Sequence, residues 1–327
     1  MTGTWEVLLP KEIDPSGPES IADFADCTGM DEYDSYEDAL ADIGRYDAVI
    51  VRVAPLTAEV IGRAEKLKVI AKHGAGLDNV DMAAAAERDV VVCNTPGANA
   101  QSVAEHTIAS LFGLRRQLHT ADRHVRSGEW ERAAFTGREL SKDTLGLYGF
   151  GNIAQKTAAM ATGMGMRVVA YDPRKPDEHF PEGVQRADRF EGLFERADAV
   201  SVHVPLTDHT HHSISTAELS ALGEHGVVVN TARGAVIDED ALVEALEAGT
   251  VGGAALDTFE SEPPGADHPL YDRDDVLLTP HIGGVTTQAL ARMSRQAAAN
   301  VRTVYEGGIP DSTRNAAELT EEGDDAE

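Results

Sequence analysis

Short apolar runs rich in valine and isoleucine recur along the chain, and stretches with helical spacing separate them. The first four runs predict β-strands at residues 5–9, 47–53, 68–73 and 89–93. Between these runs, residues 57–65 and 82–88 have the apolar spacing of amphipathic helices. Alternation of this kind predicts a parallel sheet whose strands are joined by right-handed helical crossovers.

The longest helical pattern follows the turn signal Asn94-Thr95-Pro96-Gly97 and covers about residues 98–127. Its apolar positions fall on one face, so we expect one long helix that leads from a first α/β unit to a second. Strands of the second unit are predicted at residues 144–148, 167–171, 199–204, 226–230, 253–256 and 276–278. A last helix is predicted at about residues 286–306.

At 327 residues, the chain has the length of about two domains, and hydrophobic residues make up 42% of it. No apolar run approaches the roughly 18 residues of a membrane span. The sequence does not begin with a basic stretch followed by an apolar block, as a secretory signal does. We therefore expect a cytoplasmic protein without a membrane partner, in which Cys27 and Cys93 are reduced thiols.

The chain is strongly acidic: 56 acidic residues against 28 lysine and arginine residues give a net charge of −28 at pH 7. Nucleic acids and anionic membranes would be repelled, so neither is expected as a partner. One interpretation is an ordinary acidic enzyme with a solvated tail. The other is a halophilic protein, whose surface repulsion is screened because molar salt shortens the Debye length to about 3 Å.

Six of the ten residues 318–327 are acidic, which predicts a disordered tail.

A glycine pattern, Gly-x-Gly-x-x-Ala, follows the strand predicted at residues 144–148 and opens a predicted helix at residues 153–163. Gly149 permits a tight turn, Gly151 allows a pyrophosphate to approach the backbone, and Ala154 lets helix and strand pack closely. Free N–H groups and the helix dipole would then face the phosphates. The flanking strand and helix make this pattern more specific than glycines alone.

An acidic residue, Asp172, stands at the end of the next predicted strand, 21 residues beyond Gly151. A carboxylate at this place accepts hydrogen bonds from ribose hydroxyl groups and repels a 2′-phosphate. NAD is therefore the expected cofactor. NADP stays open because Arg174 or Lys175 could reach a 2′-phosphate.

Polar side chains follow three further predicted strands: Arg233, Glu262 and His281. In a doubly wound sheet, ligands bind beyond the carboxyl ends of the strands. Reversible ketone reduction needs a cation that polarises the carbonyl group, an acid–base group that moves the hydroxyl proton, and a carboxylate that tunes that group. These three residues supply all of them.

Seven motifs together resemble the D-isomer-specific 2-hydroxyacid dehydrogenase family, over about residues 5–310. Besides the glycine turn, they are Gly74–Asp81, Asn94-Thr95-Pro96, Ala104-Glu105-His106-Thr107, Asn230-Thr231-Ala232-Arg233-Gly234, Asp257 with Glu262, and Pro280-His281-Ile282-Gly283-Gly284. The combination is far more specific than any one motif.

The resemblance implies an α/β fold with two Rossmann-like doubly wound domains, of the formate/glycerate dehydrogenase type, and a cleft between them. Residues 1–97 with 288–312 would form a discontinuous substrate-binding domain, and residues 98–287 an NAD-binding domain. Residues 313–327 would form the acidic disordered tail. A homodimer is expected.

The same resemblance assigns the chemistry to three residues. Arg233 would hold the carboxylate and keto oxygen of the substrate. His281 would be the general acid for reduction and the general base for oxidation. Glu262 would pair with His281 and favour the imidazolium form.

Other residues would bind the two ligands. The implied cofactor-binding residues are Gly149, Gly151, Asn152, Ile153, Asp172, Thr231, Ala232, Asp257 and Gly284. The implied substrate-binding residues, besides Arg233, are Arg52, Lys72, Ala75, Gly76 and Asn99.

The substrate stays open among several 2-hydroxy and 2-keto acids. Residues 74–81 and 102–107 favour a phosphoglycerate dehydrogenase-like enzyme. However, residues 51–57 depart from the run that is common in phosphoglycerate enzymes, although Arg52 could still reach a phosphate. The alternatives are a hydroxypyruvate/glyoxylate reductase and a broad 2-keto acid reductase.

Two further interpretations belong to other classes. An NAD-sensing regulatory binding protein is an alternative, but the acidic surface argues against it. The run Asp208-His209-Thr210-His211-His212 has the composition of a metal site, yet it has no fourth ligand at a sensible spacing. No metal is expected.

Overall fold

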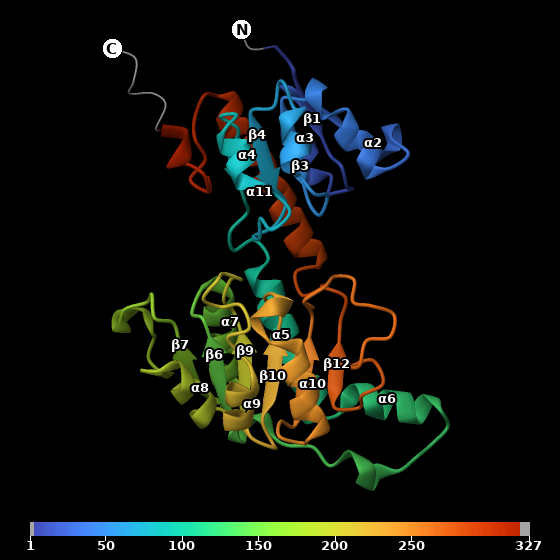
Figure 1. Cartoon of the computed structure of the whole chain (residues 1–327), viewed down its shortest axis with the longest axis vertical. Helices are drawn as coiled ribbons and strands as arrows, with labels where there is room; N and C mark the ends of the chain where they lie inside the picture. Colours follow the sequence, from blue (N-terminus) through green and yellow to red (C-terminus); the bar gives the residue numbers. More distant parts are fainter. Residues whose placement is uncertain (1–2, 321–327) are drawn as a thin grey trace. The chain divides into compact units, whose positions relative to one another are not determined.

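The structure is a computed structural model that describes residues 3–320, and the chain divides into two compact units. Unit 1 contains the described residues of Met1–Asn99 and Val285–Glu327, and unit 2 is Ala100–Gly284. Both units are built on a parallel sheet covered by helices (Figure 1). This confirms the predicted fold class. Within residues 3–320, no helix is long and apolar enough to cross a membrane.

Unit 1 has a five-stranded sheet in the order β2-β1-β3-β4-β5. Its strands are β1 (Trp5–Leu8), β2 (Ala25–Thr28), β3 (Ala48–Val51), β4 (Val69–Lys72) and β5 (Val91–Cys93). Its helices are α1 (Ser16–Glu19), α2 (Tyr36–Ala41), α3 (Ala58–Gly62), α4 (Met82–Ala86) and α11 (Thr287–Tyr305), with 3-10 turns η1 (Met30–Glu32), η2 (Ile43–Arg45) and η7 (Glu318–Thr320). All neighbouring strands pair in parallel.

Alternating side chains give this sheet two buried faces, which is why its strands are apolar throughout. Val49 and Val51 pack in the cluster that contains residues of α2, α3 and α4. Ala48 and Ile50 pack in the opposite cluster, which contains Val301 of α11.

Unit 2 has a seven-stranded sheet in the order β12-β11-β10-β9-β6-β7-β8. Its strands are β6 (Thr144–Tyr148), β7 (Arg167–Tyr171), β8 (Val184–Arg186), β9 (Ala199–Val202), β10 (Val227–Asn230), β11 (Gly253–Leu256) and β12 (Val276–Leu278). Its helices are α5 (Ala100–Arg115), α6 (Leu118–Arg126), α7 (Asn152–Gly163), α8 (Phe190–Arg196), α9 (Thr216–Leu222) and α10 (Glu239–Glu247). Four 3-10 turns complete it: η3 (Arg132–Phe135), η4 (Leu140–Lys142), η5 (Asp177–His179) and η6 (Gly234–Val236).

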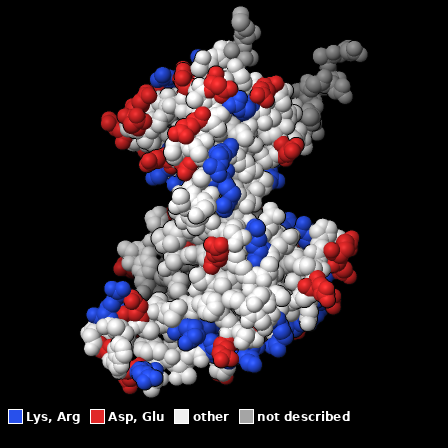
Figure 2. Space-filling view, turned by 180° about the vertical axis from the view of Figure 1, so that it is seen from behind, with Lys and Arg blue, Asp and Glu red and all other residues white. Residues whose placement is uncertain are grey.

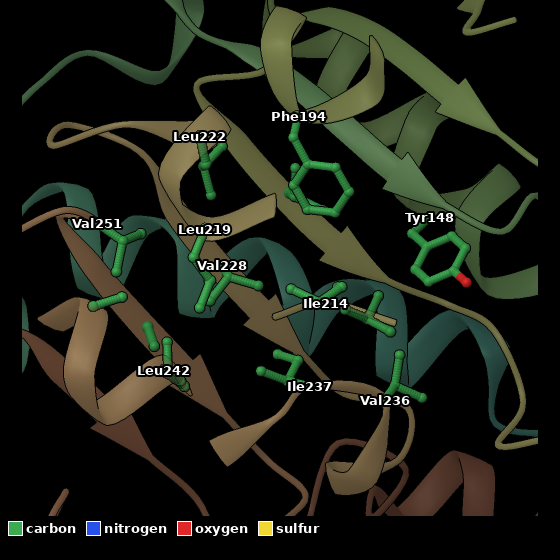
Figure 3. Close-up of a cluster of buried hydrophobic side chains, with 14 of the residues drawn as sticks. Tyr148, Phe194, Ile214, Leu219, Leu222, Val228, Val236, Ile237, Leu242 and Val251 are labelled. Carbon is green, nitrogen blue, oxygen red and sulfur yellow. The ribbon is translucent and has the colours of Figure 1, made fainter. Parts of the chain in front are cut away.

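The first strand of unit 2, β6, lies between β9 and β7, so the strand order reverses there. A reversal of this kind opens a crevice at the carboxyl ends of the strands, where doubly wound folds bind ligands. Val228 faces the core formed with α8, α9 and α10 (Figure 3), whereas Val227 and Val229 face the core formed with α5 and α7. The rigid sheet thus fixes the positions of the loops at its carboxyl edge.

The prediction of one helix over residues 98–127 is wrong. The helix ends at Arg115, and Gln117 has left-handed backbone angles, with φ 50°, before α6 begins. The side chain of Arg115 is buried and bonds to the carbonyl groups of Asp198 and His225, so tertiary contacts end α5 where no glycine or proline does. The edge strands β2 and β8 were not predicted.

The predicted disordered tail over residues 313–327 is wrong at its start. Arg314 donates its backbone N–H to Val92 (2.8 Å), and the buried side chain of Asn315 bonds to the backbone of Val90 and Val92 in and beside β5. The chain therefore continues along the edge of the unit 1 sheet after α11. The rest of the tail prediction, residues 321–327, lies outside the described residues.

Candidate active site

The glycine turn connects β6 to α7 at the point where the strand order reverses. Gly149 has φ +90°, and a Cβ there would lie 2.8 Å from the carbonyl oxygen of His203, so no other residue fits easily. Gly151 is the N-cap of α7, and open space surrounds the position of its missing Cβ. In the described part of the chain no side chain caps α7, so the N–H groups of its first turn, which contains Asn152 and Ile153, are suited to a pyrophosphate.

Asp172 follows β7 directly and is buried, with 4% of its surface exposed. One carboxylate oxygen accepts the N–H of Phe150 and the other accepts the N–H of Arg174, each at 3.0 Å. These bonds tie the glycine turn to the end of β7. Since a carboxylate oxygen has more than one acceptor site, both oxygens can also accept a ribose hydroxyl group. The residues present therefore fit a dinucleotide.

The side chains of Glu262 and His281 lie within hydrogen-bond distance of each other in unit 2, at the carboxyl side of the sheet. His281 Nδ1 lies 2.7 Å from Glu262 Oε2, and Glu262 Oε1 accepts the N–H of Phe259 at 3.1 Å. Both side chains are partly exposed, at 49% for His281 and 38% for Glu262. Pairing at Nδ1 orients the imidazole and leaves Nε2 as the atom that can exchange a proton with a substrate.

Asp257 binds the turn that carries His281. Oδ1 of this buried carboxylate accepts the hydroxyl of Thr279 (2.6 Å) and the N–H of Ile282 (2.8 Å), and Oδ2 accepts the N–H of Gly283 (2.7 Å). His281 itself has a left-handed backbone, with φ +53°, which a residue with a Cβ adopts only at a cost. The three bonds to Asp257 hold the turn in this conformation.

Arg233 lies just beyond β10, and its guanidinium donates to the carbonyl of Ala232 at 2.6 Å. The next residue, Gly234, packs so tightly that a Cβ would lie 1.8 Å from the carbonyl carbon of Phe259. The segment that carries Arg233 therefore rests directly on the segment that carries Glu262. Thr231, on the other side, bonds to Thr107 of α5 at 3.2 Å.

The remaining predicted substrate residues, Arg52, Lys72, Ala75, Gly76 and Asn99, lie in unit 1. Lys72 Nζ donates to the carbonyl of Arg52 (2.6 Å) and to the side chain of Asn79. The carbonyl of Ala75, which is exposed, accepts the side-chain amide of Asn94 at 2.6 Å. These contacts stabilise the loop after β4.

His106 was not predicted as a site residue, although one of the seven motifs contains it. Its Nε2 lies 3.1 Å from the hydroxyl of Thr279 and 3.5 Å from Asp257 Oδ1. The helix α5 thus contributes to the same hydrogen-bond network. His106 and Thr279 are 173 positions apart in the sequence. A contact over this separation leaves no signal in sequence spacing.

Among the described residues, no group of three or more His, Cys, Asp or Glu side chains is arranged to hold a metal ion. In the run that has the composition of a metal site, His212 instead lies 2.6 Å from Glu260, and its ring stacks on that of His211.

Comparison with known proteins decides the family. Residues 108–283 match the family described as D-isomer specific 2-hydroxyacid dehydrogenase, NAD binding domain. The chain belongs to this family. The expectation of a nicotinamide dinucleotide cofactor is thereby confirmed at the level of the family.

Relatives of this dehydrogenase-family chain include enzymes with different names. It is 38% identical over 306 residues to the D-3-phosphoglycerate dehydrogenase of Methanocaldococcus jannaschii, covering 93% of this chain but only 57% of that relative. It is 42% identical over 254 residues to the hydroxypyruvate reductase of Thermotoga maritima, covering 77% of this chain and 82% of the relative.

A solved structure with the same fold is the NADPH-dependent glyoxylate/hydroxypyruvate reductase of Sinorhizobium meliloti, in complex with NADP and malonate. The TM-score is 0.84 at 30% identity, with 97% of this chain and 98% of the other covered.

Proposed function

We propose that this protein is a nicotinamide-dependent dehydrogenase that interconverts a D-2-hydroxy acid and its 2-keto acid. The observation that carries the proposal is the His281–Glu262 pair, 2.7 Å apart, on a segment that packs against the one bearing Arg233. An acid–base group, its carboxylate partner and a cation are what this reaction requires.

Three residues share the chemistry. Arg233 binds the carboxylate of the keto acid and polarises its keto oxygen. His281 donates a proton from Nε2 to that oxygen during reduction and takes it back during oxidation, while Glu262 stabilises the imidazolium form. A nicotinamide, when bound, supplies or accepts the hydride.

The cofactor is held by backbone groups and one carboxylate. We assign the pyrophosphate to Gly149, Gly151, Asn152 and Ile153, and the ribose to Asp172. Because Asp172 is a buried acid beside the ribose site, NAD is favoured over NADP. Arg174, which is largely exposed and 3.8 Å from Asp172, leaves NADP as the alternative.

The nicotinamide end is assigned to Thr231, Ala232, Asp257 and Gly284. Both carboxylate oxygens of Asp257 already bind the turn that carries His281. The nicotinamide is therefore assigned to the surroundings of Asp257 and not to a bond with its carboxylate.

Unit 1 is proposed as the substrate-binding domain and unit 2 as the cofactor-binding domain. The N–H groups of Ala75 and Gly76 bind the carboxylate, with Asn99 and Arg52 as further contacts. Lys72 supports this loop through the carbonyl of Arg52. A phosphoglycerate dehydrogenase-like substrate is favoured, and hydroxypyruvate, glyoxylate or a broader set of 2-keto acids are the alternatives.

A homodimer is part of the proposal. The segment with α6 and η3 exposes Leu118, Val125 and Trp130, the last at 79% of its surface, and such a row of apolar side chains is typical of an interface. Light scattering at increasing protein concentration tests it, and a monomer at every concentration would contradict it.

A substrate panel tests the reaction. The protein, in molar KCl, is mixed with NADH or NADPH and with glyoxylate, hydroxypyruvate, 3-phosphohydroxypyruvate or 2-ketoisocaproate, and the loss of absorbance at the reduced nicotinamide band is followed. We expect turnover with NADH, and a loss of about 10²–10⁴-fold in the His281→Ala variant, as for other lost general acids. Reduction of no keto acid with either cofactor would refute the proposal.

A further inference from the structure

The segment that carries Glu262 is anchored to the beginning of α10, at Glu239. Oε1 of Glu239 accepts the backbone N–H of Glu260 at 2.7 Å, and Oε2 lies 3.1 Å from Nε2 of His268. In return, the backbone N–H of Glu239 donates to Oε1 of Glu260 at 3.2 Å. One carboxylate therefore holds the segment on both sides of Glu262.

The place of Glu239 favours a charged anchor. It is the first residue of α10, where N–H groups lack partners within the helix and the helix dipole favours negative charge. The side chains of Glu239 and His268 are only 14% and 13% exposed, so solvent screens their interaction less than it screens a surface pair.

The two neighbouring acids are compatible because each has its own histidine. Glu239 has His268, and Glu260 has His212, whose Nε2 lies 2.6 Å from Oε1 of Glu260. Each acid also accepts an N–H from the other, so like charges meet through donors rather than directly.

The bond between Glu239 and Glu260 influences Glu262 through the single peptide group that joins Phe259 to Glu260. Phe259, which precedes Glu260, donates its N–H to Oε1 of Glu262, and its ring packs edge-on against His268 with centroids 5.8 Å apart. A shift of Glu260 would therefore move the N–H that orients Glu262. Glu262 in turn orients His281.

We propose that Glu239 is a positioning residue for the acid–base pair: it holds the segment 257–268 so that Glu262 stays within hydrogen-bond distance of His281. This inference rests on the proposed function. Glu239 touches neither reacting atom, and its effect on turnover passes through Glu262.

A double-mutant cycle tests the proposal. Glu239→Ala should lower kcat by about 10- to 100-fold with a smaller change in KM, because a displacement of about 1 Å can cost about 10²-fold. In the Glu262→Gln background, the same change should have little further effect, since the partner that it positions is already impaired. Glu239→Gln, which keeps an acceptor for the N–H of Glu260, should recover part of the loss. Glu244→Gln, an exposed acid on the same helix, is the matched control and should leave kcat unchanged.

The pH profile separates positioning from general stability. The rate of reduction should fall as the pH rises, because the imidazolium form of His281 is lost. In Glu239→Ala and in Glu262→Gln we expect this fall at lower pH than in the wild type, because the imidazolium form loses its oriented partner. The proposal would be overturned if the losses of kcat in Glu239→Ala and Glu262→Gln multiplied when the two changes are combined and the pH profile of Glu239→Ala equalled that of the wild type.

Hydrogen exchange tests the anchor independently of any substrate. In Glu239→Ala, and in Glu239→Gln if the alanine variant does not fold, the amides of Phe259 and Glu260 should exchange faster than in the wild type, while α7 should be unaffected. Unchanged exchange would overturn the proposal even if the substrate panel succeeds. If instead the amides exchange faster but no keto acid in the substrate panel is reduced, the proposed function is refuted, while the anchoring of the segment by Glu239 is supported.

Discussion

At the scale of single residues, the carboxylates of this site each join two segments through their two oxygens. Asp172 joins the glycine turn to the end of β7. Asp257 holds the turn at His281 through Thr279 on one side and through Ile282 and Gly283 on the other. Glu262 connects the N–H of Phe259 to the imidazole of His281. A carboxylate has acceptor sites only, so it suits positions where backbone N–H groups converge.

Replacement of Asp257 by asparagine tests this role. The amide has nearly the same shape, but its NH₂ group would face a backbone N–H of Ile282 or Gly283, and a buried donor without an acceptor costs about 1–3 kcal/mol. We expect a lower Tm and a loss of kcat of roughly 10²-fold, as expected when a general acid is misplaced. Thermal unfolding and steady-state kinetics at 25 °C measure the two effects.

Asp272→Asn is the control for Asp257, because Asp272 is exposed and should tolerate the change. Wild-type kcat in Asp257→Asn would mean that the turn holds His281 without the carboxylate.

His203 gives a prediction about pH. Its Nε2 is buried and has no hydrogen-bond partner among residues 3–320, and burial lowers the pKa of His203 to about 3. Below pH 6.5 the unfolded chain therefore binds a proton that the folded chain does not, so His203 makes stability fall as the pH decreases from about 6.5 toward 3. His203→Asn should reduce the slope of unfolding free energy against pH by about one proton in this range.

Urea unfolding between pH 7 and pH 4.5 measures the slope for His203→Asn, without cofactor or substrate. His209→Asn, at an exposed position in the following loop, is the matched control and should keep the wild-type slope. An equal slope in His203→Asn and the wild type would show that His203 does take up its proton in the folded state.

Single residues were predictable where a motif names them and not where the contact is purely spatial. Arg233, Glu262 and His281 follow from polar positions at strand ends. The bonds from Asp257 to Thr279 and Ile282 do not, because they join residues more than twenty positions apart through a turn whose geometry no periodicity encodes.

At the scale of helices and strands, prediction succeeded where a strand is a largely continuous apolar run. The strands β6, β7, β11 and β12 have the predicted bounds, since buried parallel strands are continuous apolar runs. The edge strands β2 and β8 include exposed polar residues such as Asp26 and Gln185, so they lack that signal. The end of α5 was missed because Arg115 bonds to groups distant in the sequence.

Arg115 therefore provides the test at this scale. Its Nε lies 2.7 Å from Oδ2 of Asp143, which is fully buried, and its other nitrogens bond to two carbonyl groups at 2.6 Å. Arg115→Ala removes the buried partner of that carboxylate and leaves it Arg138, which is half-exposed and 3.5 Å from Oδ1. Breaking a buried pair on one side costs about 3–5 kcal/mol. We expect a correspondingly lower free energy of unfolding in urea.

The neighbour Arg116 is exposed, so Arg116→Ala is the matched control, with an expected change within about 0.5 kcal/mol. If Arg115→Ala unfolds at the same urea concentration as the control, the pair does not stabilise unit 2.

At the scale of the whole molecule, fold and charge obey different constraints. The two parallel sheets follow from apolar periodicity, which charge does not disturb, since the buried faces contain few ionised groups. The chain has a net charge of −28, and in its described part acidic and basic side chains occur on the surface of both units (Figure 2). Ion pairs such as Arg302–Asp23 and Arg186–Asp177 neutralise some of the acids. With 56 acids against 28 lysine and arginine residues, at least half of the carboxylates cannot be paired one-to-one in this way.

Unpaired surface acids repel one another, and salt should relieve that repulsion. The Debye length falls from about 10 Å at 0.1 M salt to about 3 Å at 1 M, so repulsion between neighbouring acids is largely screened in molar KCl. We expect the Tm to rise as KCl increases from dilute buffer to molar concentrations. A variant in which several exposed acids are replaced by their amides should have a higher Tm than the wild type in dilute buffer and a flatter dependence on KCl. Differential scanning calorimetry measures both curves, and a flat or falling wild-type curve would reject the halophilic interpretation.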